Sequence, residues 1–391
     1  MTFLAWLRTQ TFGRPGCIWL LIGFALLITK LPPTHAQGPT IQRIATGLQN
    51  PRGVAVMADG RLLVIEAGTG LASDDPSLRT GKLSVFEDMN GDGDYDDEGE
   101  ITRILESLPS YNALTAFATR HDEVGGPGDI VLLDDGRIFY TQDDPFIEVA
   151  VIEVSPDWRS AHPLVIRGAT LNAIVYDQSA DSLYVAESGA NYLIAVSLDG
   201  EVRVVTEFPV LAHDQQAVPA GLALDPRTGD LLVALFSGQI VDYFGTRLTF
   251  MPGDSKIVRV NPVTGEQRDE IGGLTTALDV AIDETGNIFV VELTTTWPAA
   301  PMPSFFRLYD PDAPPDAGGY ARFTGRVTMY PTDGGNPVQL ADGLDCPTNI
   351  TYHEGVLYVS TGQGTPGRPI IGPDGLTRIV GEIYRITNYL P

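Results

Sequence analysis

Six copies of one hairpin pattern predict an all-β chain folded as a six-bladed β-propeller with four-stranded antiparallel blades. Each copy holds an apolar strand, a turn containing Asp or Gly, and a second apolar strand. Such turns between alternating residues are typical of β-hairpins. The shortest interval between copies is 44 residues, the length of one blade. The copies begin at Gly53, Asp129, Ala173, Gly221, Asp279 and Asn349.

Further apolar segments between the copies supply the outer strands of the blades, as in Leu83–Asp88 and Ile101–Leu108. The segment Ile41–Leu48 resembles the outer strand that precedes each copy. We therefore expect it to join the last blade beside Gly381–Thr387, so that both ends of the domain share one sheet. Such closure protects sheet edges that would otherwise be exposed.

The first 36 residues predict a secretory signal peptide. Arg8 and Arg14 precede the apolar run Cys17–Ile28, and Thr34–Ala36 offers a cleavage site with small residues. The run is shorter than the roughly 20 residues of a membrane span. We expect a secreted or periplasmic protein in which residues 37–391 form a single propeller domain; the alternative is a retained anchor.

The chain is strongly acidic, with 50 Asp and Glu residues against 25 Lys and Arg and a net charge of −25. Such a field repels nucleic acids and anionic membranes and attracts cations. We expect no nucleic-acid partner and no stable membrane insertion after signal cleavage. Removing Cys17 with the signal leaves Cys346 as the one cysteine, so no intrachain disulfide is expected.

Propeller geometry brings the starts of the first strands and the ends of the second strands of all copies to one face. Long insertions follow second strands at 67–81, 237–254, 293–324 and 361–379. Long connections without a strand pattern are commonly functional. We expect 293–324, which is rich in proline and aromatic residues, to form a lid over a cup that binds a small molecule, glycan or peptide.

Polar residues gather at this predicted cup, and Asp143 also ends a second strand. Converging carboxylates and amides suit Ca²⁺, and they also suit general acid–base chemistry because repulsion raises some of their pKa values. A solvated polar channel is the alternative. The candidate ligand-binding residues are Arg52, Asp129, Asn172, Asp279 and Asn349 at first-strand starts, Glu66, Glu187 and Glu292 at second-strand ends, and Trp297 in the lid.

A second acidic cluster matches the opening of a calcium-binding loop, D-x-[DN]-x-[DN]-G. The loop departs from the motif at its last position, where Gly99 stands between two glutamates, and its flanks are strands. We expect a structural Ca²⁺ site in a hairpin on the face opposite the lid, with a plain acidic hairpin as the alternative. The candidate ligands are Asp88, Asn90, Asp92, Asp94 and Asp96.

Catalytic motifs are scarce in this sequence. His121 precedes Gly125 and Gly126 near the second copy and is a weak candidate for a catalytic base. A nucleophile elbow, a zinc-protease helix, a phosphate-binding loop and a C-x-x-C motif are all missing. The sequence therefore leaves open whether the protein is an enzyme.

Several phrases resemble the ScyD/ScyE family of secreted propellers, across roughly residues 44–387. They include GLQNPRGVAV, LPSYNALTAF, GGPGDIVLLDDG, ESGANYLIAVSLDGEVRVVTEF and GEIYRIT. The resemblance implies a secreted propeller and supplies no catalytic motif. The acidic hairpin insertion and the long lid depart from the family pattern.

Two other resemblances imply enzymes. A quinoprotein aldose dehydrogenase would use His121 as its base and pyrroloquinoline quinone as cofactor, but Arg52 stands where that family shows Trp. A Ca²⁺-dependent lactonase of the gluconolactonase type would use Glu66, Asn172 and Asp279 as metal ligands. Because one fold hosts many functions, the fold alone does not choose among them.

Overall fold

The computed structural model describes residues 38–71, 75–113, 121–238, 250–303 and 314–389, all within one compact unit. The predicted signal peptide and the middle of the predicted lid lie outside these residues. No helix in the described part of the chain has the length and apolar character needed to cross a membrane.

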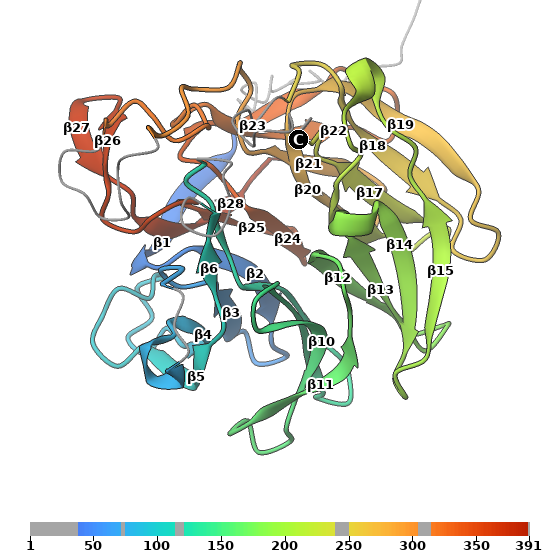
Figure 1. Ribbon diagram of the computed structural model, residues 1–391, viewed down its shortest axis with the longest axis horizontal. Coiled ribbons are helices and arrows are strands. Elements are labelled where there is room, and N and C mark those ends of the chain that lie inside the picture. Colours follow the sequence, from blue (N-terminus) through green and yellow to red (C-terminus); the bar gives the residue numbers. More distant parts are fainter. Residues whose placement is uncertain (1–37, 72–74, 114–120, 239–249, 304–313, 390–391) are drawn as a thin grey trace, which may run out of the picture. The chain divides into compact units, whose positions relative to one another are not determined.

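Six four-stranded antiparallel sheets confirm the predicted propeller (Figure 1). Blade 1 contains β2 (Pro51–Val56), β3 (Leu62–Glu66), β4 (Gly81–Phe86) and β5 (Ile101–Leu108). Blade 2 contains β8 (Pro127–Leu132), β9 (Ile138–Asp144), β10 (Glu148–Val154) and β11 (Ala161–Ile166). Blades 3 and 4 are formed by β12 (Leu171–Asp177), β13 (Ser182–Glu187), β14 (Tyr192–Ser197) and β15 (Val202–Glu207), and by β16 (Pro219–Leu224), β17 (Leu231–Leu235), β18 (Ser255–Val260) and β19 (Gln267–Leu274). Blades 5 and 6 are formed by β20 (Ala277–Ile282), β21 (Ile288–Glu292), β22 (Gly325–Tyr330) and β23 (Val338–Leu344), and by β24 (Asn349–His353), β25 (Val356–Thr361), β28 (Gly381–Thr387) and β1 (Thr40–Leu48).

The six blades close into a ring. Each innermost strand contacts the innermost strand of the next blade, and β24 contacts β2 to complete the circle. The insertions on one face add two short hairpins, and three single 3-10 turns are the remaining regular elements of the described residues. These elements are β6 (Tyr111–Asn112) with β7 (Val124–Gly125), β26 (Pro369–Gly372) with β27 (Gly375–Arg378), and η1 (Pro76–Leu78), η2 (Ser188–Ala190) and η3 (Ala212–Asp214).

Closure uses strands from both ends of the domain, as predicted. β1 pairs antiparallel with β28, from Thr40 opposite Thr387 to Leu48 opposite Gly381. Ile44 and Ala45 on β1 are fully buried. The pairing therefore satisfies the edge of β28 and also adds apolar contacts to the core between blades 6 and 1.

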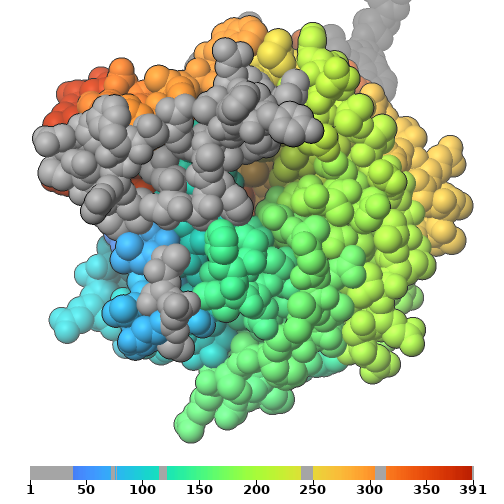
Figure 2. Space-filling model, in the orientation of Figure 1, coloured from blue at the N-terminus to red at the C-terminus, as the bar shows by residue number. Residues whose placement is uncertain are grey.

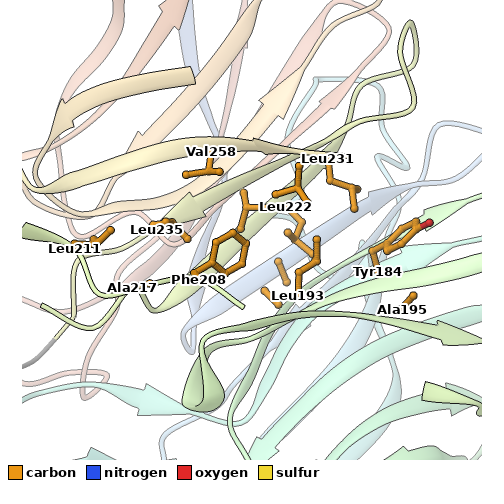
Figure 3. Packing of buried hydrophobic residues seen from close by; sticks show 14 residues of the cluster. Tyr184, Leu193, Ala195, Phe208, Leu211, Ala217, Leu222, Leu231, Leu235 and Val258 are labelled. Carbon is orange, nitrogen blue, oxygen red and sulfur yellow. The ribbon is translucent and has the colours of Figure 1, made fainter. Parts of the chain in front are cut away.

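The core lies between the faces of adjoining blades. In Figure 3, Leu193 of blade 3 and Leu222 of blade 4 point toward one another within a cluster that also holds Phe208. The space-filling view shows blades 2 and 3, coloured green, as one continuous surface (Figure 2). Cys346 is buried as a free thiol. Alternation of apolar residues along each strand thus fills every gap between neighbouring sheets.

Ile44→Ala tests how strongly the ring depends on β1. We expect a loss of about 2–5 kcal/mol in the free energy of unfolding, because the side chain is fully buried at the closing seam. Ile41→Ala on the same strand is the matched control, since Ile41 is 44% exposed. Denaturant unfolding of both variants measures the difference, and equal stabilities would contradict a closing role for β1.

Candidate functional site

A cavity of about 510 Å³ opens at the axis, on the face where first strands start and second strands end. Its size lies within the range of small-molecule sites. All six blades contribute, through residues that include Arg52, Asp129, Asn172, Phe236, Asp279 and Asn349.

The floor of the cavity is a hydrogen-bonded network across the axis. The Asn349 side-chain amide donates to Asp279 Oδ2 at 2.8 Å and to Asp129 Oδ1 at 3.3 Å. Each carboxylate also accepts backbone N–H groups from its own and the next blade, from Ile174 to Asp129 and from Ile350 to Asp279. These two carboxylates therefore tie neighbouring blades together.

Glycines leave room for this network. A Cβ atom on Gly53 would lie 2.5 Å from Asp129 Oδ1, and one on Gly221 would lie 2.3 Å from Asp279 Oδ1. Burial raises the pKa of Asp129 to about 6, and burial together with the charge of Asp129 raises the pKa of Asp279 well above its usual value. The floor thus makes a proton easier to hold on Asp279 than on Asp129.

One wall of the cavity carries charged groups from blades 1 and 2. Arg52 Nη2 donates to the Val124 carbonyl and to Gln363 Oε1, the latter at 2.9 Å. Glu123 accepts a hydrogen bond from the Tyr320 hydroxyl at 3.1 Å. Burial lowers the pKa of Arg52 and raises that of Glu123. Within the described residues, neither group forms an ion pair.

Asp143 completes this wall. Its side chain lines the cavity but is only 6% exposed. Tyr111 lies 3.2 Å away and donates its hydroxyl proton to Oδ2, whereas Oδ1 has no hydrogen-bond partner in the part of the chain that the structure describes. Burial raises the pKa of Asp143 to about 7, and nearby Glu123 and Asp144 add to the increase.

The opposite wall is apolar. Blades 4 and 5 stand across the ring from blades 1 and 2, and they line the cavity with Val218, Phe236, Leu278 and Leu293. Tyr320, from the described end of the lid insertion, also lines the cavity and stacks on Phe250 at 6.2 Å between ring centroids. The cavity therefore suits a molecule with one polar end and one apolar end.

Five predicted binding residues meet in the cavity, and four do not. Arg52, Asp129, Asn172, Asp279 and Asn349 line it, as the propeller geometry predicts. Trp297 is 61% exposed and is absent from the lining. The remaining three form ion pairs outside the cavity: Glu66 with Lys82, Glu187 with Arg167, and Glu292 with Arg326.

Strand register explains why the glutamates at the ends of the second strands do not line the cavity, whereas Asp143 does. Glu66 lies opposite Lys82 on β4, and Glu292 lies opposite Arg326 on β22. The matching residue of blade 2 is the neutral Gln142, opposite Ala150. Asp143 comes one residue later, and successive side chains point to opposite faces of a strand. The carboxylate of blade 2 therefore enters the cavity.

His121 is buried beside the lid insertion rather than on the cavity wall. Its ring lies 6.0 Å from the Tyr320 ring, and a Cβ on Gly319 would meet it at 2.2 Å. The neighbouring Asp122 is fully buried and bonds Arg368, which joins this segment to the insertion after β25. The structure thus places His121 in a packed support layer behind the site.

The predicted calcium loop lies between β4 and β5, with its oxygens turned toward backbone N–H groups. Asp88 Oδ1 accepts from Gly91 at 2.6 Å, and Asn90 Oδ1 accepts from Asp92 at 2.8 Å. Asp94 and Asp96 follow the same pattern, toward Asp96 and Thr46. Across the described residues, no group of three or more His, Cys, Asp or Glu is arranged to hold a metal ion. Calcium binding here would exchange these hydrogen bonds for metal contacts and stays a prediction.

Two enzyme readings fit this arrangement poorly. The expected lactonase ligands Asn172 and Asp279 line the cavity, but Glu66 lies outside it in an ion pair. Pyrroloquinoline quinone carries three carboxylates, whereas Arg52 is the one basic side chain among the described lining residues. Neither cofactor therefore finds its expected partners together at the cavity.

The sequence did not predict four of the cavity-lining residues, namely Glu123, Tyr111, Tyr320 and Gln363. All four belong to insertions outside the blade strands, where the strand periodicity of the repeat gives no information. The phrase LPSYNALTAF, which contains Tyr111, was the one available signal, since it carried part of the family resemblance.

Comparison with known proteins supports the fold and nothing finer. No family model and no curated protein sequence matches the chain. Solved structures that match are six-bladed propeller proteins. A gluconolactonase from Xanthomonas campestris is 13% identical, with 89% of each chain covered and a TM-score of 0.50. A Bacteroides thetaiotaomicron protein of unknown function is 11% identical over 90% of this chain and 76% of its own, at 0.53. Virginiamycin B lyase from Staphylococcus aureus is 12% identical over 89% of this chain and 99% of its own, at 0.47.

Asp143→Asn tests the buried carboxylate through the pH dependence of stability. The raised pKa means that the folded protein holds a proton which the unfolded chain releases, so this contribution is lost as pH rises through about 7. Asparagine mimics the protonated form at every pH. We expect the variant to gain about 2 kcal/mol over wild type between pH 5 and pH 8, measured by denaturant unfolding. Asp374 is exposed, so the free energy of unfolding of Asp374→Asn should depend on pH in the same way as that of wild type. The same pH dependence for Asp143→Asn would refute the burial argument.

Chelation tests the acidic loop. If Ca²⁺ binds at Asp88–Asp96, it offsets the repulsion among the carboxylates, so EDTA should lower the melting temperature and added Ca²⁺ should restore it. Asp92→Ala should abolish that response. A melting temperature indifferent to EDTA would leave a plain acidic hairpin.

Proposed function

We propose that this protein is an exported binding propeller of the ScyD/ScyE type, which takes a small molecule, glycan or short peptide in its axial cup. The observation that carries the proposal is the cavity of about 510 Å³, whose wall holds three charged groups, Arg52, Glu123 and Asp143, that form no ion pair with any described residue. Buried charges are normally paired, so a ligand that pairs them would offset a cost that the empty protein bears.

The two-sided lining supports an organic ligand. Val218, Phe236 and Leu278 give one wall an apolar surface, and Arg52 and Asp143 give the other wall a donor and an acceptor. Small-molecule sites combine apolar walls with a few placed polar groups in this way. The acidic field of the chain adds a preference for ligands that carry positive charge.

A hydrolase acting on lactones is the second candidate. Asp143 favours it, because a carboxylate that lines the cavity, has a pKa of about 7 and keeps one oxygen without a hydrogen-bond partner in the described residues suits a general base. The gluconolactonase likeness supports the fold needed for this role. Hydrolysis of a lactone panel that Asp143→Asn abolishes would favour the enzyme over the binding protein.

Filling the cup tests the proposed function. Thr170 lines the cavity, so Thr170→Trp should block it and remove the thermal stabilisation produced by ligands from a screen of small molecules, glycans and peptides. Val204→Trp on β15 is the matched control, since Val204 is 48% exposed on an outer strand. Ligands that bind Thr170→Trp as well as wild type would place binding elsewhere and overturn the proposal.

A further inference from the structure

The cup wall carries three charged groups, Arg52, Glu123 and Asp143, that form no ion pair among the described residues. Elsewhere on this face, buried carboxylates have basic partners: Glu66 has Lys82, Glu187 has Arg167, and Asp122 has Arg368. In the described residues, Arg52 and Asp143 each lack an ion partner within 4.0 Å. Both line the same cavity. Glu123 lines it too, but one of its oxygens already accepts the Tyr320 hydroxyl.

We infer that the cup recognises a zwitterion, with Asp143 receiving an ammonium group and Arg52 receiving a carboxylate. This inference rests on the proposed function, because it names the ligand class of the same cavity. The ligand class is that of free amino acids and short peptides, which carry both charges at neutral pH.

The unpaired donors and acceptors of the two residues match this chemistry. Asp143 Oδ1 is a buried acceptor without a donor, and an ammonium group supplies three N–H donors. Among the described residues, the hydrogen bonds of Arg52 involve Nη2 alone, so the other donors of its guanidinium remain for a carboxylate. Tyr111 donates a hydrogen bond to the other oxygen, Oδ2, and so orients the carboxylate.

The remaining walls select the rest of the molecule. Val218, Phe236, Leu278 and Leu293 face the charged pair from across the ring and suit an apolar side chain. Tyr320 borders the same space, and aromatic rings also favour cations. A neutral sugar would pair with neither buried charge, so this wall disfavours glycans relative to amino acids and peptides.

Calorimetry with defined probes tests the inference on the wild-type protein. The probes are the free amino acids with apolar side chains, their dipeptides, their N-acetyl derivatives, their amides and glucose. We expect the zwitterions to bind, and loss of either charge by acetylation or amidation to weaken binding by about 10- to 100-fold. Zwitterions that fail to bind at about 10 mM, or that bind no better than their capped derivatives, would overturn it.

Matched variants assign each charge to its residue. Asp143→Asn should weaken the zwitterion and the amide but leave the N-acetyl acid unchanged, and Arg52→Gln should show the reverse preference. Asp144→Asn is the control, because Asp144 is buried beside Asp143 but absent from the cavity lining. Equal losses for all probes in both variants would indicate disturbed folding, and the wild-type probe series then decides alone.

The same series separates this inference from the proposed function. Binding of glucose or another neutral molecule that Thr170→Trp blocks, without binding of zwitterions, would keep the cup and reject the zwitterion. Failure of every screened ligand to respond to Thr170→Trp would reject both.

Discussion

The pairing of β1 with β28 is the contact on which the site depends, because it holds β24 beside β2. β24 carries Asn349, whose amide joins Asp129 and Asp279 across the axis. The insertion after β25 carries Gln363, which accepts a hydrogen bond from Arg52 at the cavity wall. An open ring would separate blade 6 from blade 1 and remove the floor and one wall together. Closure is thus both a stability device and the means of building the cup.

Crowding at the axis then decides which groups remain available to a ligand. Six inner strands converge there, and Gly53 and Gly221 let the two aspartates approach neighbouring backbone. Those carboxylates accept backbone N–H groups from adjoining blades, so their hydrogen-bonding capacity serves the ring. The wall carries the open groups instead. Among the three lining aspartates, Asp143 is the one with a buried oxygen that has no hydrogen-bond partner in the described residues.

The sequence reveals the propeller well because its signal is repeated and local. Alternating apolar residues and Asp-Gly turns recur six times, and the closing segment Ile41–Leu48 carries the same outer-strand pattern. The site is less visible. Propeller geometry was enough to place the starts of the first strands at the cavity. It was not enough for the ends of the second strands, because Asp143 lies one residue beyond the position that corresponds to Glu66. Successive side chains of a strand point to opposite faces, so this single residue decides whether the carboxylate faces the cavity. Glu123 and Tyr320 lie in insertions without periodicity.

That one-residue difference identifies blade 2 as the blade in which the buried carboxylate has lost a stabilising ion pair. Blades 1, 3 and 5 bury a glutamate against a basic side chain, whereas blade 2 has Gln142 opposite Ala150 and a displaced Asp143. A buried carboxylate and a buried guanidinium without ion partners each cost desolvation energy. Departures from local consistency of this kind concentrate at functional sites. In a repeat protein, such a departure can be compared with the other copies of the repeat. Here blades 1, 3 and 5, in which the glutamate forms an ion pair, show how the same position is filled when it does not face a ligand.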